Sequence, residues 1–268
     1  MLADKKYFLF DIDGTLAVDQ TLYPGSKELI DYIDSIGGRS FYITNNSVKS
    51  RKDYVDKFRG WGIETAKDQF MTASYATCRY LEKHYKGKKL FVMGTPSFVE
   101  EVKEYGLLVT EEYQEDVECV VVGFDRTLRY DKVEAACRLL WHKEIDYIGT
   151  NPDLRCPTAF GFVPDCGGIC QMISVAVDRE PYYIGKPNAD IVTLCTDQVR
   201  AKKEEVLVVG DRLYTDIACG IYAGVETALV YTGEAKKEDL SETEFMPDYT
   251  FENIQELFEA FRKCREEA

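Results

Sequence analysis

One repeated pattern restricts the fold of this chain more than any other feature: a short apolar run ends in a polar loop, and an amphipathic stretch follows. The apolar residues 7–10 are followed by the letters DIDGT, and the amphipathic stretch 27–37 comes after this loop. The apolar residues 40–43 are followed by TNNS, and the amphipathic stretch 50–61 comes after this loop. Such alternation is typical of parallel strands joined by helices. The N-terminal part is therefore predicted to form a parallel sheet with helices on both faces.

The same pattern returns near the C-terminus. Residues 205–209 run into GDRLYTD, a helix-like stretch covers 217–224, and residues 227–231 supply one more apolar run. An acidic amphipathic stretch around 254–264 then predicts a last helix. The fold class that both ends of the chain predict is α/β.

The distances between the polar strand ends predict an inserted domain. Asp11 and Thr44 are 33 residues apart and Lys186 and Asp211 are 25 apart, whereas 142 residues separate Thr44 from Lys186. A simple crossover needs only ~30 residues. The surplus of roughly 100 residues has the size of a small domain.

This middle segment has an α/β pattern of its own, with strand-like KLFVMG, CVVVGF and DYIGTN between helix-like stretches. We therefore predict a discontinuous core of residues 1–77 and 183–268, interrupted by an α/β cap domain of residues 78–182.

Composition limits the partners and the compartment. Asp plus Glu (47) exceed Lys plus Arg (33) for a net charge of -14, and no basic run offsets it, so no nucleic acid and no membrane partner is expected. No apolar stretch approaches ~18 to 20 residues and residues 1–11 lack the features of a signal peptide, which predicts a cytoplasmic protein. The nine scattered cysteines are predicted to be reduced.

Carboxylates follow two of the predicted strands. Asp11 and Asp13 share a loop that Gly14 lets turn sharply, Asp211 follows another strand, and Asp216 comes five residues later. The carboxyl ends of parallel strands meet at one edge of a sheet, so these groups are expected in one pocket. They would repel one another and raise one another's pKa unless a cation were bound. Ligands that are all oxygen favour Mg²⁺.

Three further polar residues fit an anion at the same edge. Lys186 precedes a predicted helix and supplies a positive charge, while Thr44 and Asn45 offer hydroxyl and amide donors for phosphate oxygens. Each piece alone has a structural explanation, since DxD and GDxxxTD can cap helices and TNNS can form a turn. Together, at strand ends, they favour a metal and phosphate site.

These residues carry a resemblance to a known family. Four segments resemble the four motifs of the haloacid dehalogenase (HAD) superfamily, and an insertion between the second and third resembles its nitrophenylphosphatase-like, NagD-type branch with a large α/β cap. The resemblance implies a Rossmann-like, doubly wound core, Mg²⁺, and hydrolysis of phosphate monoesters. The motifs are DIDGTL (11–16), ITNNS (43–47), GKP (185–187) and VVGDRLYTDI (208–217), with TNPD (150–153) and CGGICQMISVAV similar to the branch's cap segments.

The resemblance also implies a role for each motif residue. Asp11 would be the nucleophile that forms an aspartyl-phosphate, and Asp13 the general acid and base. Thr44 and Asn45 would hold the phosphoryl oxygens, and Lys186 would neutralise charge between Asp11 and the phosphate.

The implied metal site uses some of the same residues. Mg²⁺ would be bound by the carboxylates of Asp11 and Asp211 and by the main-chain carbonyl of Asp13. Asp216 would orient these ligands through water or Lys186.

Because the core motifs bind only phosphate and metal, the cap is expected to recognise the leaving group. Asn151, Asp153 and Arg126 are candidates because each follows a strand-like run, although turn and capping roles explain them equally well. The resemblance suggests nucleotides, sugar phosphates, glycolytic side products, pyridoxal phosphate or similar small metabolites, with nitrophenyl phosphate as an artificial substrate, and a possible homodimer through the cap.

Two other readings stay open. A phosphomutase or other phosphotransferase would keep the Asp11 and Asp13 pair, but family mutases commonly carry a small cap between the first two motifs. A receiver-like module would accept phosphate on an Asp without being an enzyme, yet it would need no domain-sized insertion.

Overall fold

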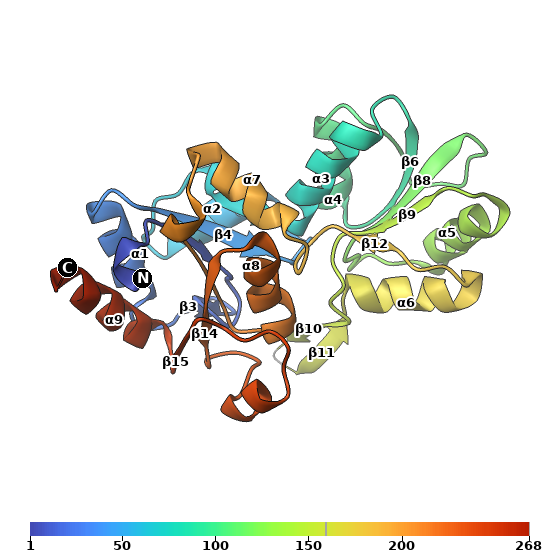
Figure 1. Ribbon diagram of the computed structural model, residues 1–268. Helices are drawn as coiled ribbons and strands as arrows, with labels where there is room; N and C mark the ends of the chain where they lie inside the picture. Colours follow the sequence, from blue (N-terminus) through green and yellow to red (C-terminus); the bar gives the residue numbers. More distant parts are fainter. Residues whose placement is uncertain (159, 268) are drawn as a thin grey trace. The chain divides into compact units, whose positions relative to one another are not determined.

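The computed structural model describes residues 1–158 and 160–267. The chain divides into two compact units, and Figure 1 shows it leave one, pass through the other in green and yellow, and return. The first unit holds Met1–Thr44, Val55–Met71 and Lys186–Ala268, and the second unit holds Asn45–Tyr54 and Thr72–Gly185. The predicted limits of 78–182 for the inserted domain stay a prediction, and its start falls inside helix α3 (Ala73–His84).

The first unit is built on a parallel sheet whose central strand is β1 (Tyr7–Phe10). Its parallel neighbours are β4 (Arg39–Thr44) on one side and β13 (Val206–Gly210) on the other. The chain fills one side of β1 and then the other, so the ends of these three strands form the crevice in which such sheets bind ligands. The outer strands are β5 (Phe70–Thr72) beyond β4, and β14 (Glu226–Val230) and β15 (Tyr249–Phe251) beyond β13.

Helices cover this sheet as the amphipathic stretches predict. In Figure 1, α1 (Ser26–Ser35) and α9 (Ile254–Glu266) lie side by side, and the ring of Tyr32 packs 5.7 Å from that of Phe261. The other helices of this part are α2 (Arg51–Gly60), α7 (Asp190–Val199), α8 (Ala218–Ala223), the π-helical turn η4 (Leu213–Ile217), and the 3-10 turns η1 (Leu2–Asp4), η2 (Lys67–Gln69), η3 (Lys203–Glu205) and η5 (Lys237–Ser241). A small hairpin, β2 (Ala17–Val18) and β3 (Thr21–Leu22), follows β1.

The second unit has its own parallel sheet, so the prediction that the middle segment has an α/β fold of its own is confirmed. Its strand order is β12-β9-β8-β6-β7. The bounds are β6 (Lys89–Met93), β7 (Leu108–Thr110), β8 (Val117–Val122), β9 (Asp146–Gly149) and β12 (Tyr182–Tyr183), with helices α3, α4 (Pro96–Glu104), α5 (Tyr130–His142) and α6 (Cys166–Val177).

An antiparallel hairpin and helix α6 are among the elements of the second unit that were not predicted. The antiparallel hairpin of β10 (Arg155–Thr158) and β11 (Gly161–Pro164) is short and contains Pro and Gly, which obscure the alternation of a strand. Helix α6 begins with CGGIC, and the two glycines weaken its helical signal.

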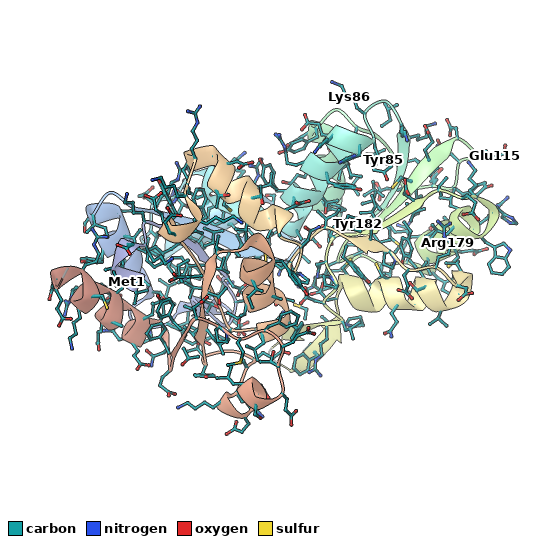
Figure 2. The ribbon with its side chains drawn as sticks, in the orientation of Figure 1. Met1, Tyr85, Lys86, Glu115, Arg179 and Tyr182 are labelled. Atoms are coloured by element: carbon teal, nitrogen blue, oxygen red, sulfur yellow. The ribbon has the colours of Figure 1, made fainter. Side chains whose placement is uncertain are left out.

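Helices α5 and α6 pack together against the sheet of the second unit. Arg179, labelled in Figure 2, lies just after α6 and donates to the carbonyl oxygens of Leu140 and Lys143 at the end of α5, at 3.0 and 2.9 Å. It therefore satisfies carbonyls that the helix itself leaves without partners.

The structure also bears on the state of the cysteines and on whether a helix could cross a membrane. All nine cysteines are free thiols. Among the described residues, every helix is too short or too polar to cross a bilayer.

The packing of α9 gives a prediction of stability. The side chain of Phe261 is fully buried, with its ring 4.9 Å from that of Phe8. Phe261→Ala should lower the free energy of unfolding by about 3–5 kcal/mol, because it opens a cavity between α9 and the sheet. Chemical denaturation measures this, and Glu259→Ala on the exposed face of α9 should change it by less than about 0.5 kcal/mol. Equal effects of the two changes would contradict this packing.

Candidate active site

A buried ammonium group holds the centre of the site. Lys186 Nζ lies 2.6 Å from Asp11 Oδ1 and 2.6 Å from Asp216 Oδ1, and it also donates to the carbonyl oxygen of Ile43 at 3.0 Å. Lys186 is 2% exposed and Asp216 is 1% exposed. Asp11 follows β1 directly, and Asp216 belongs to the π-helical turn η4 after β13. The fold thus joins residues from three of the predicted motifs in one ion network.

Asp211 completes the group of carboxylates. It follows β13, and its oxygens accept hydrogen bonds from Thr15 Oγ1 at 3.3 Å and from the backbone N–H of Glu234 at 2.8 Å. Oxygen atoms of Asp11, Asp211 and Asp216 all lie within 4.8 Å of one another. The prediction that carboxylates gather at the ends of β1 and β13 is therefore confirmed for these three.

Two glycines make room for Asp211. A Cβ at Gly233 would lie 1.9 Å from Asp211 Oδ2, and one at Gly14 would lie 2.7 Å from it. Gly14 also has φ +101°, a conformation that other residues rarely adopt. Any side chain at either position would push the carboxylate out of place.

The charges of this group are out of balance. Burial raises the pKa of Asp11 well above its usual range, with the nearby Asp216 and Asp211 adding to the rise and Lys186 opposing it. Burial, together with Asp216, raises the pKa of Asp211 to about 6. Burial alone would lower the pKa of Lys186, yet Asp11 and Asp216 hold it above its usual value.

These shifts bear on whether a metal fits. Three buried carboxylates face one buried ammonium, so two negative charges are left over when all are ionised. A hard divalent cation would offset this repulsion, and a donor set made of oxygen atoms suits Mg²⁺. The residues present therefore fit the metal that the motifs imply.

Asp13 lies in the loop after β1, and Thr44 is the last residue of the neighbouring strand β4. The side chain of Asp13 is 39% exposed, and its Oδ1 lies 3.5 Å from Lys57 Nζ. Thr44 is 3% exposed at the last position of β4. Both belong to the first unit, with the three buried carboxylates and Lys186.

Asn45 follows Thr44 in the chain but belongs to the second unit, where its Nδ2 donates to Asp153 Oδ2 at 2.7 Å. Asn151 Nδ2 donates to the same oxygen at 2.8 Å and to Asp165 Oδ1 at 3.1 Å. Asn151 is fully buried and Asp153 is 7% exposed, whereas Arg126 is exposed. The buried pair therefore ties loops of the second unit together, and contact of all three candidates with a leaving group stays a prediction.

Some residues of the site carried no signal in the sequence. Thr15 and Glu234 reach Asp211 through one hydroxyl and one backbone N–H, and Lys57 reaches Asp13 from helix α2. Thr15 stands inside the first motif and could have been noticed there. Glu234 and Lys57 stand outside every motif, so only the folded structure brings them to the carboxylates.

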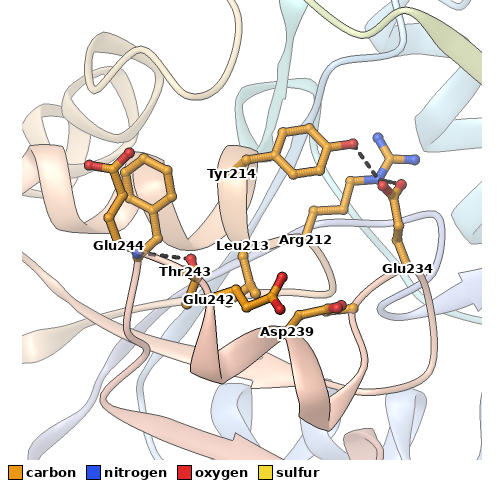
Figure 3. Close-up of a pocket in the computed structure, with 10 residues that line it drawn as sticks. Arg212, Leu213, Tyr214, Glu234, Asp239, Glu242, Thr243 and Glu244 are labelled. Atoms are coloured by element: carbon orange, nitrogen blue, oxygen red, sulfur yellow. Dashed lines mark hydrogen bonds and ion pairs between the residues drawn. The ribbon is translucent and has the colours of Figure 1, made fainter.

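A pocket of about 340 Å³ in the first unit is lined in part by Arg212, the residue after Asp211, and by Glu234 (Figure 3). Glu234 lies at its edge, where it accepts from Tyr214 Oη at 2.9 Å and pairs with Arg212 Nε at 3.0 Å. A phosphate dianion would be repelled by the carboxylates of this pocket, so it is a poor match for the predicted substrate. Its lining residues are Arg212, Leu213, Tyr214, Glu234, Ala235, Asp239, Glu242, Thr243, Glu244 and Phe245.

The burial of Asn151 gives a prediction. Asn151→Ala should lower the free energy of unfolding by about 1–3 kcal/mol, because Asp153 and Asp165 each lose a buried hydrogen-bond donor. Arg126→Ala, at an exposed side chain, should change it by less than about 0.5 kcal/mol. Thermal and chemical denaturation measure both, and an Asn151→Ala protein as stable as the parent would remove the structural role.

Comparison with known proteins agrees with this geometry. A family model described as haloacid dehalogenase-like hydrolase matches residues 8–108, and one described as HAD-hydrolase-like matches residues 183–257. The acid sugar phosphatase of Staphylococcus haemolyticus (strain JCSC1435) is 32% identical over 249 residues, which cover 93% of this chain and 94% of that protein.

Solved structures are similar over the same length. The 4-nitrophenylphosphatase of Thermotoga maritima has a TM-score of 0.91 and 37% identity, covering 97% of this chain and 98% of that one. NagD of E. coli K-12 has a TM-score of 0.85 and 30% identity, covering 94% of this chain and 98% of that one. The chain therefore belongs to the haloacid dehalogenase (HAD) superfamily of hydrolases, in its branch of NagD-type phosphatases.

Proposed function

We propose that this phosphatase is a Mg²⁺-dependent phosphate monoester hydrolase that acts through an aspartyl-phosphate on a small phosphorylated metabolite. The observation that carries the proposal is the position of Lys186 Nζ, 2.6 Å from both Asp11 and Asp216, beside a third buried carboxylate. An ammonium and a divalent cation together can neutralise a nucleophilic carboxylate and a phosphate dianion that would otherwise repel each other.

The first half of the reaction uses Asp11 and Asp13. A carboxylate oxygen of Asp11 attacks phosphorus, the bond from phosphorus to the ester oxygen breaks, and a proton passes from Asp13 to that oxygen. Lys186 holds Asp11 in place and favours its charged form, while the hydroxyl of Thr44 and the amide of Asn45 hold phosphoryl oxygens.

The second half regenerates the enzyme. Asp13 takes a proton from water, the water oxygen attacks phosphorus, and the bond to Asp11 breaks to release inorganic phosphate. Bound Mg²⁺ would be held by Asp11, Asp211 and the carbonyl of Asp13, with Asp216 orienting them, and would supply charge neutralisation at the phosphoryl oxygens.

The class of substrate is proposed from the relatives. Proteins named acid sugar phosphatase and 4-nitrophenylphosphatase match nearly the whole chain. We therefore place sugar phosphates first among the candidate metabolites, ahead of nucleotides and pyridoxal phosphate, with nitrophenyl phosphate as an artificial substrate. A homodimer through the second unit is proposed on the family resemblance alone.

A product analysis separates hydrolysis from the alternatives. With Mg²⁺ and 4-nitrophenyl phosphate, a hydrolase releases nitrophenol and inorganic phosphate in equal amounts over many turnovers. A phosphotransferase or mutase would move phosphate to an added sugar or alcohol instead, and a receiver-like module would stop after one equivalent.

Replacement of the nucleophile gives the next prediction. Asp11→Asn should lower kcat by at least about 10³-fold, because the amide cannot attack phosphorus. It should also raise the melting temperature of the metal-free protein, since burial and neighbouring carboxylates destabilise the charged form of Asp11. Asp197→Asn, the same chemical change at an exposed position of α7, should alter neither quantity. An active Asp11→Asn enzyme would exclude the covalent mechanism.

Removal of the metal gives a further prediction. The protein stripped with a chelator should be inactive, regain activity with Mg²⁺ and fail to do so with Ca²⁺, which prefers more ligands at longer distances. Mg²⁺ should also raise the melting temperature of the stripped protein, and this rise should disappear in Asp211→Asn. Full activity after stripping, or equal support by Ca²⁺, would contradict the proposed metal.

A further inference from the structure

The backbone of Asp13 is held by hydrogen bonds, whereas its side chain, which carries the carboxyl group, is partly exposed. Asp13 forms an isolated bridge with Ala17, and the backbone N–H of Gly14 donates to the carbonyl of Ala17 at 2.8 Å. The hydroxyl of Thr232 donates to the carbonyl of Gly14 at 2.6 Å. The side chain itself is 39% exposed, so these backbone contacts leave the direction of the carboxyl group undetermined.

Lys57 is the cation that faces this carboxyl group. Its Nζ lies 3.5 Å from Asp13 Oδ1, and its side chain is only 7% exposed although the ammonium is charged. A lysine on the surface of a helix normally extends into water, where its ion pairs contribute little. Here the side chain is held against the protein with its charge directed at Asp13.

Trp61, one helical turn after Lys57, holds that side chain in place. Lys57 Nζ lies 4.8 Å from the centre of the Trp61 ring, within reach of a cation–π interaction. The indole Nε1–H donates to the carbonyl oxygen of Gln20 at 2.7 Å, in the turn between β2 and β3. That hairpin also supplies Ala17, which bridges to Asp13, so the contacts form a closed ring within the first unit.

We infer that Lys57 is a positioning residue for Asp13, which it holds in the direction needed to pass a proton to the ester oxygen. The inference rests on the proposed function, because it assigns Lys57 a part in the step in which the bond from phosphorus to the ester oxygen breaks. Lys57 acts through Asp13 and not on the phosphorus or on Asp11, and together with Trp61 it sets one orientation of the carboxyl group.

The consequence is a dependence on the leaving group. An alkoxide must receive the proton from Asp13 as it departs, whereas 4-nitrophenolate is weakly basic and departs without it. The ratio kcat/KM contains only the steps up to departure of the alcohol, so it is free of the later hydrolysis of the aspartyl-phosphate. Loss of Lys57 should therefore lower kcat/KM for an alkyl ester far more than for a nitrophenyl ester.

The experiment compares two esters of almost the same shape, 4-nitrobenzyl phosphate and 4-nitrophenyl phosphate. In Lys57→Met, which keeps the length and the apolar contacts of the side chain, kcat/KM for the benzyl ester should fall about 10-fold or more. For the phenyl ester it should fall less than about 3-fold. Lys57→Arg should restore most of the benzyl activity, because it returns a cation to Asp13.

Lys52→Met is the matched control, since Lys52 lies exposed on the same helix and should leave both ratios unchanged. Circular dichroism and melting curves show whether each variant is folded. Equal loss of both esters in folded Lys57→Met, loss of neither, or no rescue by Lys57→Arg would overturn the inference while leaving the phosphatase proposal intact. A parent enzyme that hydrolyses neither ester with Mg²⁺ would remove the proposed function, and the inference with it.

Discussion

The rest of the site depends on one buried ammonium group, that of Lys186. Asp11 and Asp216 are buried together, and each lies 2.6 Å from its Nζ. Without it, three carboxylates within 4.8 Å of one another would have to take up protons or move apart. Removal of either partner of a buried ion pair leaves the other charge without compensation and strongly destabilises the protein. The network therefore holds the loops at the strand ends in one arrangement. The proposed nucleophile is thus positioned by the same contact that favours its charged form.

Close packing of backbone around Asp211 adds a second constraint. Gly14 and Gly233 leave space that any side chain would fill, and the backbone N–H of Glu234 uses that space to reach the carboxylate. The site is therefore held by backbone groups as well as by charges. Such a site is organised before substrate arrives, which is the condition under which fixed charges contribute most to catalysis.

The sequence predicted the parts of this structure that repeat along the chain. The strand at 7–10 agrees residue for residue with β1, and the helices predicted at 50–61 and 254–264 agree with α2 and α9 to within two residues. The hairpin of β10 and β11 and helix α6 were missed, because Pro and Gly break the periodicity that marks a strand or a helix. Asn151 and Asp153 were predicted to contact the leaving group, with turn and capping roles as the alternative. Both are buried and joined by a hydrogen bond, and their contact with a leaving group stays a prediction.

By itself, the sequence determined the α/β alternation, the order of the motifs and the choice of oxygen ligands. Hydrophobic periodicity and side-chain chemistry can both be recognised within short segments of the chain. Only the tertiary structure decided which of these groups meet. Lys186 stands 175 residues from Asp11 and reaches it because it precedes helix α7, which packs against β1 and β4. Lys57 faces Asp13 because helix α2 turns that side toward the loop after β1. Such pairings follow from strand order and helix rotation, which no local pattern records.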